Sequence, residues 1–385
     1  MRRLWQQLAI ATNWPILAAM AVLCLLGIIS VWADSPADAR KQLAFMGVGM
    51  VCLVLLQTVS YLYLGQYAWP FYLLGLLLIA YTILPFERVP LVREIKGSRA
   101  WINLGPLSLQ PAELMKIGFC LVMARYLRFR SNYRSLAGLI PPFVLALVPL
   151  VVILRQPDLG TALVFVPALF AMLFAAGAKL RHLLGIVALG VVTLPVIWLA
   201  GTDTPVLRHL PPLVRNYQRS RIKVMFSEDP RIVQRFGYQQ AHALMAFGSG
   251  GWTGRGPFNI PVGRQVPEAH NDMIFALIGE QFGFVGAAVT LAAYLVLFAA
   301  GIEIAAATKE PFGRLVAVGI VAMLAGQTFL NLLVCVRLMP VTGVTLPFVS
   351  YGGSSLLASF IAAGLLLNIG QNRPLMIGRT AFEFD

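Results

Sequence analysis

The sequence predicts an all-α, polytopic membrane protein of about ten transmembrane helices, and three observations support this fold class. Hydrophobic residues make up 58% of the 385 residues and charged residues only 12%, whereas a soluble domain is about 25% charged. The apolar residues gather in ten runs, most of them near the roughly 20 residues that a helix needs to cross a bilayer. None alternates in polarity as the strands of a membrane barrel do. We therefore expect one helical unit over residues 1–385.

Each helix is expected where an apolar run reaches spanning length. The first run, 15–32, follows Arg2 and Arg3, as a signal peptide would. Its 18 residues exceed the roughly 7–15 of a signal peptide, so we expect it to be retained. The other nine lie near 43–64, 67–85, 110–127, 139–154, 159–177, 183–200, 272–301, 313–336 and 344–370.

Lysine and arginine in the loops predict the orientation, because cytoplasmic loops carry an excess of these residues. With both termini in the cytoplasm, the inner segments hold twelve basic residues and the short outer loops hold eight. The segment 125–134 contributes most, since it has four arginines and no acidic residue. We therefore expect both termini on the cytoplasmic side.

One connection, 201–271, is far longer than the roughly 2–8 residues that usually join packed helices. It lies between the seventh and eighth predicted helices, on the outer side, and contains nine basic and four acidic residues. Its aromatic residues, glycines and amphipathic pieces predict an ordered, functional loop. The glycine-rich run 248–256 lacks the preceding strand of a dinucleotide fingerprint, so we interpret it as a flexible lid.

Ionisable residues at membrane depth are candidates for function, because they are costly there. Glu113 and Lys116 are three residues apart and share one helix face. They form either a buried structural ion pair or, with Lys116 facing a polar cavity, a site for an anion. Asp158 precedes a predicted span and either caps that helix or has a functional role.

Asp272 opens the eighth predicted span, after Glu268 and His270. Either Asn271 or Asp272 caps this helix, or Asp272 is a general base at the mouth of a cavity, and the residues alone favour neither. The segment 340–355 contains prolines, glycines and hydroxyl residues at membrane depth. Irregular backbone is tolerated there only where protein shields it or where it lines a cavity. We therefore expect a polar cavity near this segment, with a hydrogen-bonded helix kink as the alternative.

Several other chemistries have no support in the sequence. The four cysteines lie in apolar stretches without metal-ligand spacing, and there are only four histidines. No Walker A loop, nucleophile elbow or zinc motif occurs, and we expect no organic cofactor. The net charge of +14 includes a basic excess on the outer face, which indicates an anionic substrate, with anionic lipid of the outer leaflet as the alternative. Nucleic acid is not expected, because the basic loop lies on the outer face.

Four separated segments form a recognisable set. They are GSRAWINLGPLSLQPAELMKIG (97–118), RQPDLGTALVF (155–165), PEAHNDMIFALIGEQFGFVG (267–286) and NLLVCVRLMPVTGVTLPFVSYGGSS (331–355). This set resembles the SEDS family of bacterial cell-wall polymerases, the group containing RodA and FtsW. With the ten-helix plan and the long loop, the likeness covers nearly the whole chain. QPDLGTA, AGAKLRHLL and the short N-terminal tail look more like RodA than FtsW.

The resemblance implies a peptidoglycan glycosyltransferase of the bacterial cytoplasmic membrane that acts in elongation and cell shape. Its substrate would be lipid II, the undecaprenyl-pyrophosphate-linked disaccharide pentapeptide. Asp272 falls on the family's catalytic aspartate, and Trp101, Glu113, Lys116 and Asp158 fall on positions around the family's central cavity. The family's partner is a class B penicillin-binding protein with transpeptidase activity, together with other membrane proteins of the elongation complex.

The sequence departs from the family pattern at three places. Many members have an arginine directly before the tryptophan, where this chain has Ala100, with Arg99 one position earlier. Arg337 stands where a glycine is usual, and Gln281 follows Glu280 in place of a second glutamate. These departures concern contacts with the substrate and leave the class of enzyme unchanged.

The implied chemistry needs one base, since pyrophosphate is a good leaving group and requires no proton donor. Asp272 is the candidate base. Preorganised cations would stabilise the charge on the pyrophosphate, with a divalent cation (Mg²⁺ or Mn²⁺) as a further contributor. The expected substrate-binding residues are Trp101, Lys116, Glu113, Asp158, Arg99, His270, Arg221, Ser350 and Ser354, and the carboxylates considered for a metal are Asp272, Glu113 and Asp158.

Two alternative functions remain open. A flippase or transporter could move the lipid-linked precursor across the bilayer, and a scaffold could hold a transpeptidase without chemistry of its own. A flippase needs affinity on both faces of the membrane, whereas a polymerase concentrates its polar residues on the outer face. The basic loop 201–271 and Asp272 follow the second pattern.

Overall fold

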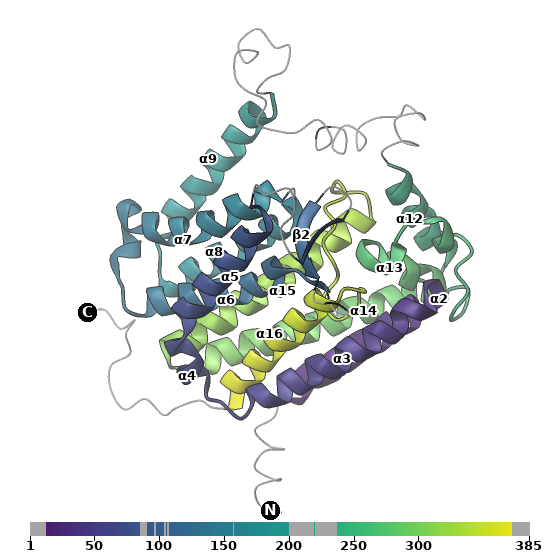
Figure 1. Cartoon of the computed structure of the whole chain (residues 1–385), viewed down its shortest axis with the longest axis horizontal. Helices are drawn as coiled ribbons and strands as arrows, with labels where there is room; N and C mark the ends of the chain where they lie inside the picture. The colour runs from purple at the N-terminus through teal and green to yellow at the C-terminus, as the bar shows by residue number, and fades with distance from the viewer. Residues whose placement is uncertain are drawn as a thin grey trace, which may run out of the picture.

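The computed structural model describes residues 13–371 except 85–90, 96–97, 104, 106–107, 157, 200–218 and 220–236. Within these ranges the chain forms a helical bundle with one small sheet (Figure 1). The long helices are α2 (Trp14–Asp34), α3 (Pro36–Leu56), α5 (Ala68–Thr82), α6 (Pro111–Arg128), α7 (Leu136–Arg155), α8 (Leu159–Ala176), α9 (Leu180–Leu199), α14 (Ile274–Ala307), α15 (Pro311–Cys335) and α16 (Gly353–Gln371). The short ones are α4 (Tyr61–Gln66), η1 (Asn132–Arg134), α12 (Tyr238–Ser249), η2 (Gly263–Gln265) and α13 (Ala269–Asp272). A helix thus stands at every apolar run that the sequence predicts.

Seven of the helices in the described part of the chain are long and apolar enough to cross a membrane: α2, α3, α7, α8, α14, α15 and α16. Helix α5 and the described apolar part of α9, Leu180–Thr193, are apolar but shorter. Helix α6 has spanning length, but its sequence includes Glu113, Lys116, Arg125 and Arg128. The prediction of a polytopic, mainly α-helical membrane protein is confirmed.

Helix ends follow the local sequence. Proline occupies the first turn of α3, α6 and α15, where no intrahelical N–H bond is lost. The Glu310 carboxylate caps α15 by accepting the N–H groups of Phe312 and Gly313 at 3.0 and 2.6 Å. At the other end of α15, Leu338 N–H bonds to Leu333 O at 2.8 Å, and Arg337 has a φ of +59°. This is a Schellman motif whose left-handed position, usually glycine, holds arginine.

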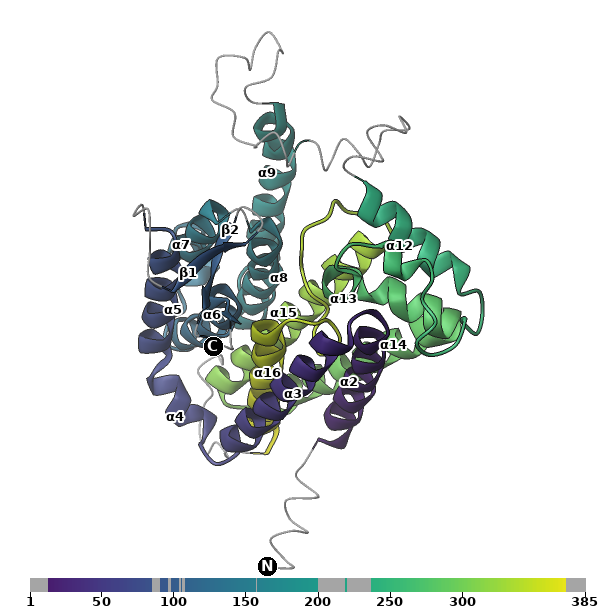
Figure 2. The ribbon, with the colours of Figure 1, turned by 45° about the vertical axis from the view of Figure 1, so that its right-hand side comes forward.

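Helix α16 lies in the middle of the bundle, against α3, α6, α14 and α15 (Figures 1 and 2). Near its C-terminal end, the buried Asn368 side chain accepts Tyr61 N–H at 3.0 Å and donates to Val59 O at 2.7 Å and to Leu56 O. Helix α9 is at the periphery and packs on α8. The last helix therefore completes the core that the first helices begin.

A three-stranded antiparallel sheet that the sequence pattern does not predict precedes α6. Strand β2 (Ser98–Asn103) pairs with β1 (Val92–Ile95) and with β3 (Ser108–Leu109). The sheet lies against α5, α6 and α16. Its strands are too short to give a strong alternating pattern, and the prediction of an all-α polytopic membrane protein holds for the helical bundle that the sheet accompanies.

One further prediction needs correction, and another holds for the part of it that the structure describes. The last helix begins at Gly353 and not near residue 344, because Pro347 and the backbone of Phe348, at a φ of +65°, interrupt the apolar run. The predicted loop 201–271 is ordered in its described part, residues 237–271, which contains α12, η2 and α13. Its residues 201–218 and 220–236 lie outside the described residues, and Arg221 is among them.

Candidate functional site

The candidate residues lie together at one end of the bundle, called here the Asp272 end. Helices α2, α7 and α15 end there, and helices α3, α6, α8, α14 and α16 begin there. The irregular segment 338–352 between α15 and α16 folds into this end. Leu346, Phe348, Val349 and Ser350 are buried. Glycines allow the helices to approach it: a Cβ on Gly160 would lie 2.5 Å from Thr342 O, and one on Gly27 would lie 2.5 Å from Val349 O. The predicted break in the helix is present, and protein surrounds it.

A buried ion pair marks the side of the site formed by α6. Lys116 Nζ lies 2.9 Å from Glu113 Oε2, and the two side chains are 3% and 7% exposed. Lys116 also donates to Gln327 Oε1 on α15 at 2.7 Å. Gln327 in turn donates to Thr345 O at 3.0 Å. The structural ion pair is therefore present, and it is connected through Gln327 to the irregular segment.

Asp158 lies close to this pair and caps α8. Its carboxylate accepts Thr161 N–H at 3.0 Å, Thr161 Oγ1 at 2.8 Å and Gln110 Nε2 at 2.8 Å. Burial raises the pKa of Asp158, and the bonds from Thr161 oppose the rise. Glu113 raises the same pKa and Lys116 lowers it, so the three charges act on one another. The capping interpretation of Asp158 is confirmed.

The two predicted serines have structural partners in this region. Ser354 Oγ accepts Gln110 N–H at 2.8 Å and donates to Ser108 O at 3.0 Å, which ties α16 to β3. Ser350 Oγ accepts Leu346 N–H at 2.7 Å and closes a turn in the irregular segment. Both hydroxyls therefore hold the backbone around the site.

Asp272 is the last residue of α13 and is 9% exposed. Its Oδ1 accepts Gln239 Nε2 of α12 at 2.9 Å, and its carbonyl accepts Asn331 Nδ2 of α15 at 2.8 Å. Helix α14 has Met273 at its N-cap position and no capping side chain. The alternative that Asn271 or Asp272 caps this helix is therefore wrong.

His270 lies on the same short helix as Asp272 and contacts α2, the first long helix. Its Nδ1 is hydrogen-bonded to the Asp34 carboxylate at the end of α2. Its carbonyl accepts Tyr351 N–H at 2.9 Å, and the two rings meet edge to face at 5.5 Å. Helix α13 is thus held at His270, just before Asp272, by α2 and by the irregular segment.

The Asp272 side and the Lys116 side share one stretch of backbone. Asn331 and Gln327 are four residues apart, so they lie on one face of α15. Asn331 Nδ2 donates both to Asp272 O and to Val344 O, each at 2.8 Å. Gln327 bonds to the next residue, Thr345. Gln110, Gln239, Gln327 and Asn331 were not predicted, since no sequence signal separates them from other amides.

The remaining predictions are met to different degrees. Arg99 and Trp101 lie on β2 and are half-buried, beside α5 and α6.

Among the described residues, no group of three or more His, Cys, Asp or Glu side chains could hold a metal ion. Glu113 is paired with Lys116, Asp158 is used as a cap, and Asp272 is held by Gln239. The three carboxylates therefore do not form a metal site in this arrangement.

The glycine-rich run predicted to be a flexible lid is packed on α14. At Gly283 that helix has a φ of +63° and a ψ of −156°, a conformation open to glycine alone. Phe284 N–H and Val285 N–H bond to Gly251 O and Trp252 O at 2.9 and 3.1 Å. Just before this break, the buried Glu280 carboxylate accepts the N–H groups of residues 262 and 263 at 2.9 and 2.7 Å. The lid interpretation is wrong for this run.

Comparisons with known proteins agree with this architecture. Residues 7–374 match the FtsW/RodA/SpoVE family, described as "Cell cycle protein". Stage V sporulation protein E of Bacillus subtilis is 35% identical over 356 residues, covering 89% of this chain and 90% of the relative. The probable peptidoglycan glycosyltransferase FtsW of Geobacter metallireducens is 34% identical over 373 residues, covering 92% and 93%.

Solved structures give the same result. A chain from a study of the structural coordination of polymerization and crosslinking by a peptidoglycan synthase complex has a TM-score of 0.77, 32% identity, and coverage of 94% of this chain and 98% of that chain. The rod shape determining protein RodA of Thermus thermophilus has a TM-score of 0.69, 30% identity, and coverage of 95% and 98%. These comparisons do not single out RodA among the members. The chain belongs to the FtsW/RodA/SpoVE, or SEDS, family.

Proposed function

We propose that this protein is a peptidoglycan glycosyltransferase that polymerises glycan strands from lipid II. Its family and its relatives named probable peptidoglycan glycosyltransferase support the class of reaction. The observation that carries the proposal is the position of Asp272. Its nearly buried carboxylate stands at the end of a membrane bundle, and α2, α12, α15 and the irregular segment fix its backbone and side chain.

In the proposed reaction, Asp272 accepts the proton of the acceptor sugar hydroxyl as that oxygen attacks the anomeric carbon of the donor. The bond from this carbon to the pyrophosphate oxygen breaks, the configuration inverts, and undecaprenyl pyrophosphate leaves as an anion. Gln239 Nε2 donates to Oδ1 of Asp272 at 2.9 Å and so sets the direction of the carboxylate. No protein acid is required for the leaving group.

Charge on the pyrophosphate needs cationic partners. Lys116 and Arg99 are the proposed contributors from α6 and β2, with Trp101 beside them on the strand. Lys116 uses two of its three N–H donors in its contacts with Glu113 and Gln327, and the third can bond to an anion. No step is assigned to Mg²⁺ or Mn²⁺, since the carboxylates are engaged elsewhere.

The proposal places both termini in the cytoplasm and the Asp272 end at the outer face of the bacterial cytoplasmic membrane. A class B penicillin-binding protein is the proposed partner, and other membrane proteins of the elongation complex would join it. The neighbouring structure described as a complex that coordinates polymerization and crosslinking supports such a pairing. A RodA-like role in elongation and cell shape rests on the motifs QPDLGTA and AGAKLRHLL.

The test is glycan polymerisation from purified lipid II in proteoliposomes. Asp272→Asn should lower the rate by roughly 10²–10⁴-fold, as loss of a general base does. Glu303→Gln removes an exposed carboxylate from the same helix, α14, and should leave the rate unchanged. Polymer of normal length from folded Asp272→Asn protein would refute the base assignment. Transport of lipid II across vesicles without polymer would favour the flippase alternative.

A further inference from the structure

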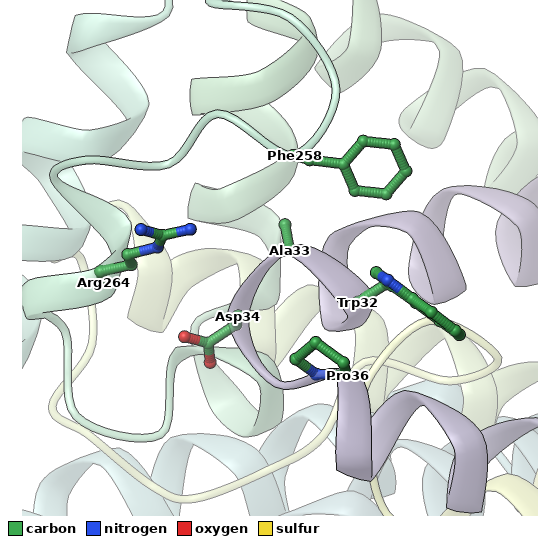
Figure 3. A pocket seen from close by; sticks show the side chains of 6 residues that line it. All are labelled: Trp32, Ala33, Asp34, Pro36, Phe258 and Arg264. Carbon is green, nitrogen blue, oxygen red and sulfur yellow. The ribbon is translucent and has the colours of Figure 1, made fainter.

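A pocket of about 340 Å³ opens beside the site, between the turn from α2 to α3 and the loop that precedes α13 (Figure 3). Its lining residues are Trp32, Ala33, Asp34 and Pro36 on one side and Phe258 and Arg264 on the other. This volume is at the lower end of the range for small-molecule sites. It suits a head group better than a whole lipid-linked saccharide.

Arg264 gives the pocket its charge. Its side chain is exposed and, among the described residues, makes neither an ion pair nor a hydrogen bond. Its backbone is held, because Arg264 N–H bonds to Ile260 O at 3.0 Å and Glu280 binds the N–H groups of Val262 and Gly263. A guanidinium on a fixed backbone without a counter-ion is suited to a phosphate.

Asp34 is the other charged residue of the pocket, and its carboxylate is hydrogen-bonded to His270. Among the described residues, no ion pair joins the Asp34 carboxylate to Arg264. In Figure 3 the guanidinium of Arg264 and the carboxylate of Asp34 lie on the same side of the pocket, away from the ring of Trp32. A head group with a phosphate and a neighbouring ammonium or hydroxyl would complement both charges.

The pocket lies where α2 leaves the apolar phase. Helix α2 is a candidate span of 21 residues, and Trp32 is in its last turn. Tryptophan is enriched where a span meets the lipid head groups. Trp32 is 39% exposed and Phe258 is 52% exposed, so the apolar wall can be reached from the bilayer.

Phe258 is held in this position at a conformational cost. Its φ is +66°, and its N–H bonds to Gln281 Oε1 at 3.0 Å. A residue other than glycine in the left-handed region is strained, and such strain clusters at ligand clamps. The structure thus maintains an unfavourable backbone that presents an aromatic ring to an open pocket.

We infer that this pocket binds the phosphate head group of a lipid from the leaflet at which α2 ends. Arg264 pairs with the phosphate, and Trp32, Pro36 and Phe258 cover the first carbons of the attached chain. The head group belongs either to a membrane phospholipid or to a polyprenyl phosphate, which share this chemistry. The inference uses the proposed function only to identify the leaflet as the outer one.

The test is titration of delipidated protein in a nonionic detergent, with bound lipid counted by native mass spectrometry. The probes are phosphatidylglycerol, phosphatidylethanolamine and polyprenyl phosphate. Arg264→Gln should weaken their binding by tenfold to about a hundredfold, as expected for loss of one charge-assisted contact. Lys309→Gln makes the same charge change at an exposed position outside the pocket and should change binding by less than about twofold.

Phe258→Gly provides a second variant that relieves strain and removes the ring. It should weaken binding of all three lipids while leaving the fold intact. Stronger binding of polyprenyl phosphate than of the phospholipids assigns the pocket to lipid-linked intermediates, and equal binding assigns it to the bulk membrane. Wild-type affinity of Arg264→Gln, or an equal loss in Lys309→Gln, overturns the inference. These probes do not react, so the result is independent of the polymerisation assay.

Discussion

Replacing Gly283 by alanine tests whether the loop after α12 depends on the break in α14. A Cβ at this position would lie 2.4 Å from Gly254 N and 2.6 Å from both C and O of Trp252. These are backbone atoms, so a side-chain rotation cannot relieve the clash. The backbone conformation itself adds about 1–3 kcal/mol for alanine, and overpacking typically adds about 1–3 kcal/mol. Reduced freedom of the unfolded chain returns about 0.4–1 kcal/mol. The net loss of stability should be about 2–5 kcal/mol.

The assay is unfolding in mixed micelles with increasing sodium dodecyl sulfate, combined with limited proteolysis of residues 250–266. Gly283→Ala should unfold earlier and should be cut faster in this loop. Gly190→Ala is the matched control, since a Cβ on this helical glycine of α9 meets no atom within 4 Å. It should be neutral or stabilise by up to about 1 kcal/mol. Equal stability and equal cleavage of Gly283→Ala and wild type would refute the packed-loop interpretation.

Three further substitutions give separate tests. Arg337→Gly should raise the free energy of unfolding by about 0.5–1 kcal/mol, because it removes left-handed strain at the end of α15; a loss in the same micelle titration would show that the arginine side chain outweighs the strain. Lys116→Met should lower the free energy of unfolding by about 3–5 kcal/mol, because it leaves the buried Glu113 carboxylate unpaired. Adding Glu113→Gln should restore part of that free energy, and no recovery in the double variant would contradict a tightly coupled pair. Asp34→Asn should slow polymerisation roughly tenfold by weakening its bond to His270, and an unchanged rate would remove Asp34 from the positioning of α13.

The sequence was sufficient for the helices because burial in lipid selects long apolar runs regardless of tertiary detail. It also indicated Lys116, Glu113 and Asp272, since charges at membrane depth are rare and costly. Their uncharged partners were missed. Gln110, Gln239, Gln327 and Asn331 acquire their meaning only when α12, α15 and the irregular segment come together, and nothing in local spacing distinguishes them.

Two errors share one physical cause. The glycines of the run 248–256 predict flexibility, whereas Gly250 and Gly254 allow backbone to pack on backbone at Gly279 and Gln281. The final helix was extended back to residue 344 because its apolar composition continues through the irregular segment. In both places the tertiary neighbour, absent from the sequence pattern, determines the backbone conformation.

The position of Asn368 has a consequence for the assembly of the protein in the membrane. The Asn368 side-chain amide forms hydrogen bonds with backbone groups of Leu56, Val59 and Tyr61, which are translated about 300 residues earlier. Until α16 is inserted, those groups lack their final partner, and α3 lacks the helix on which it packs. Insertion of the first nine long helices therefore yields an intermediate with an open centre. A chain shortened by its last helix would expose that centre.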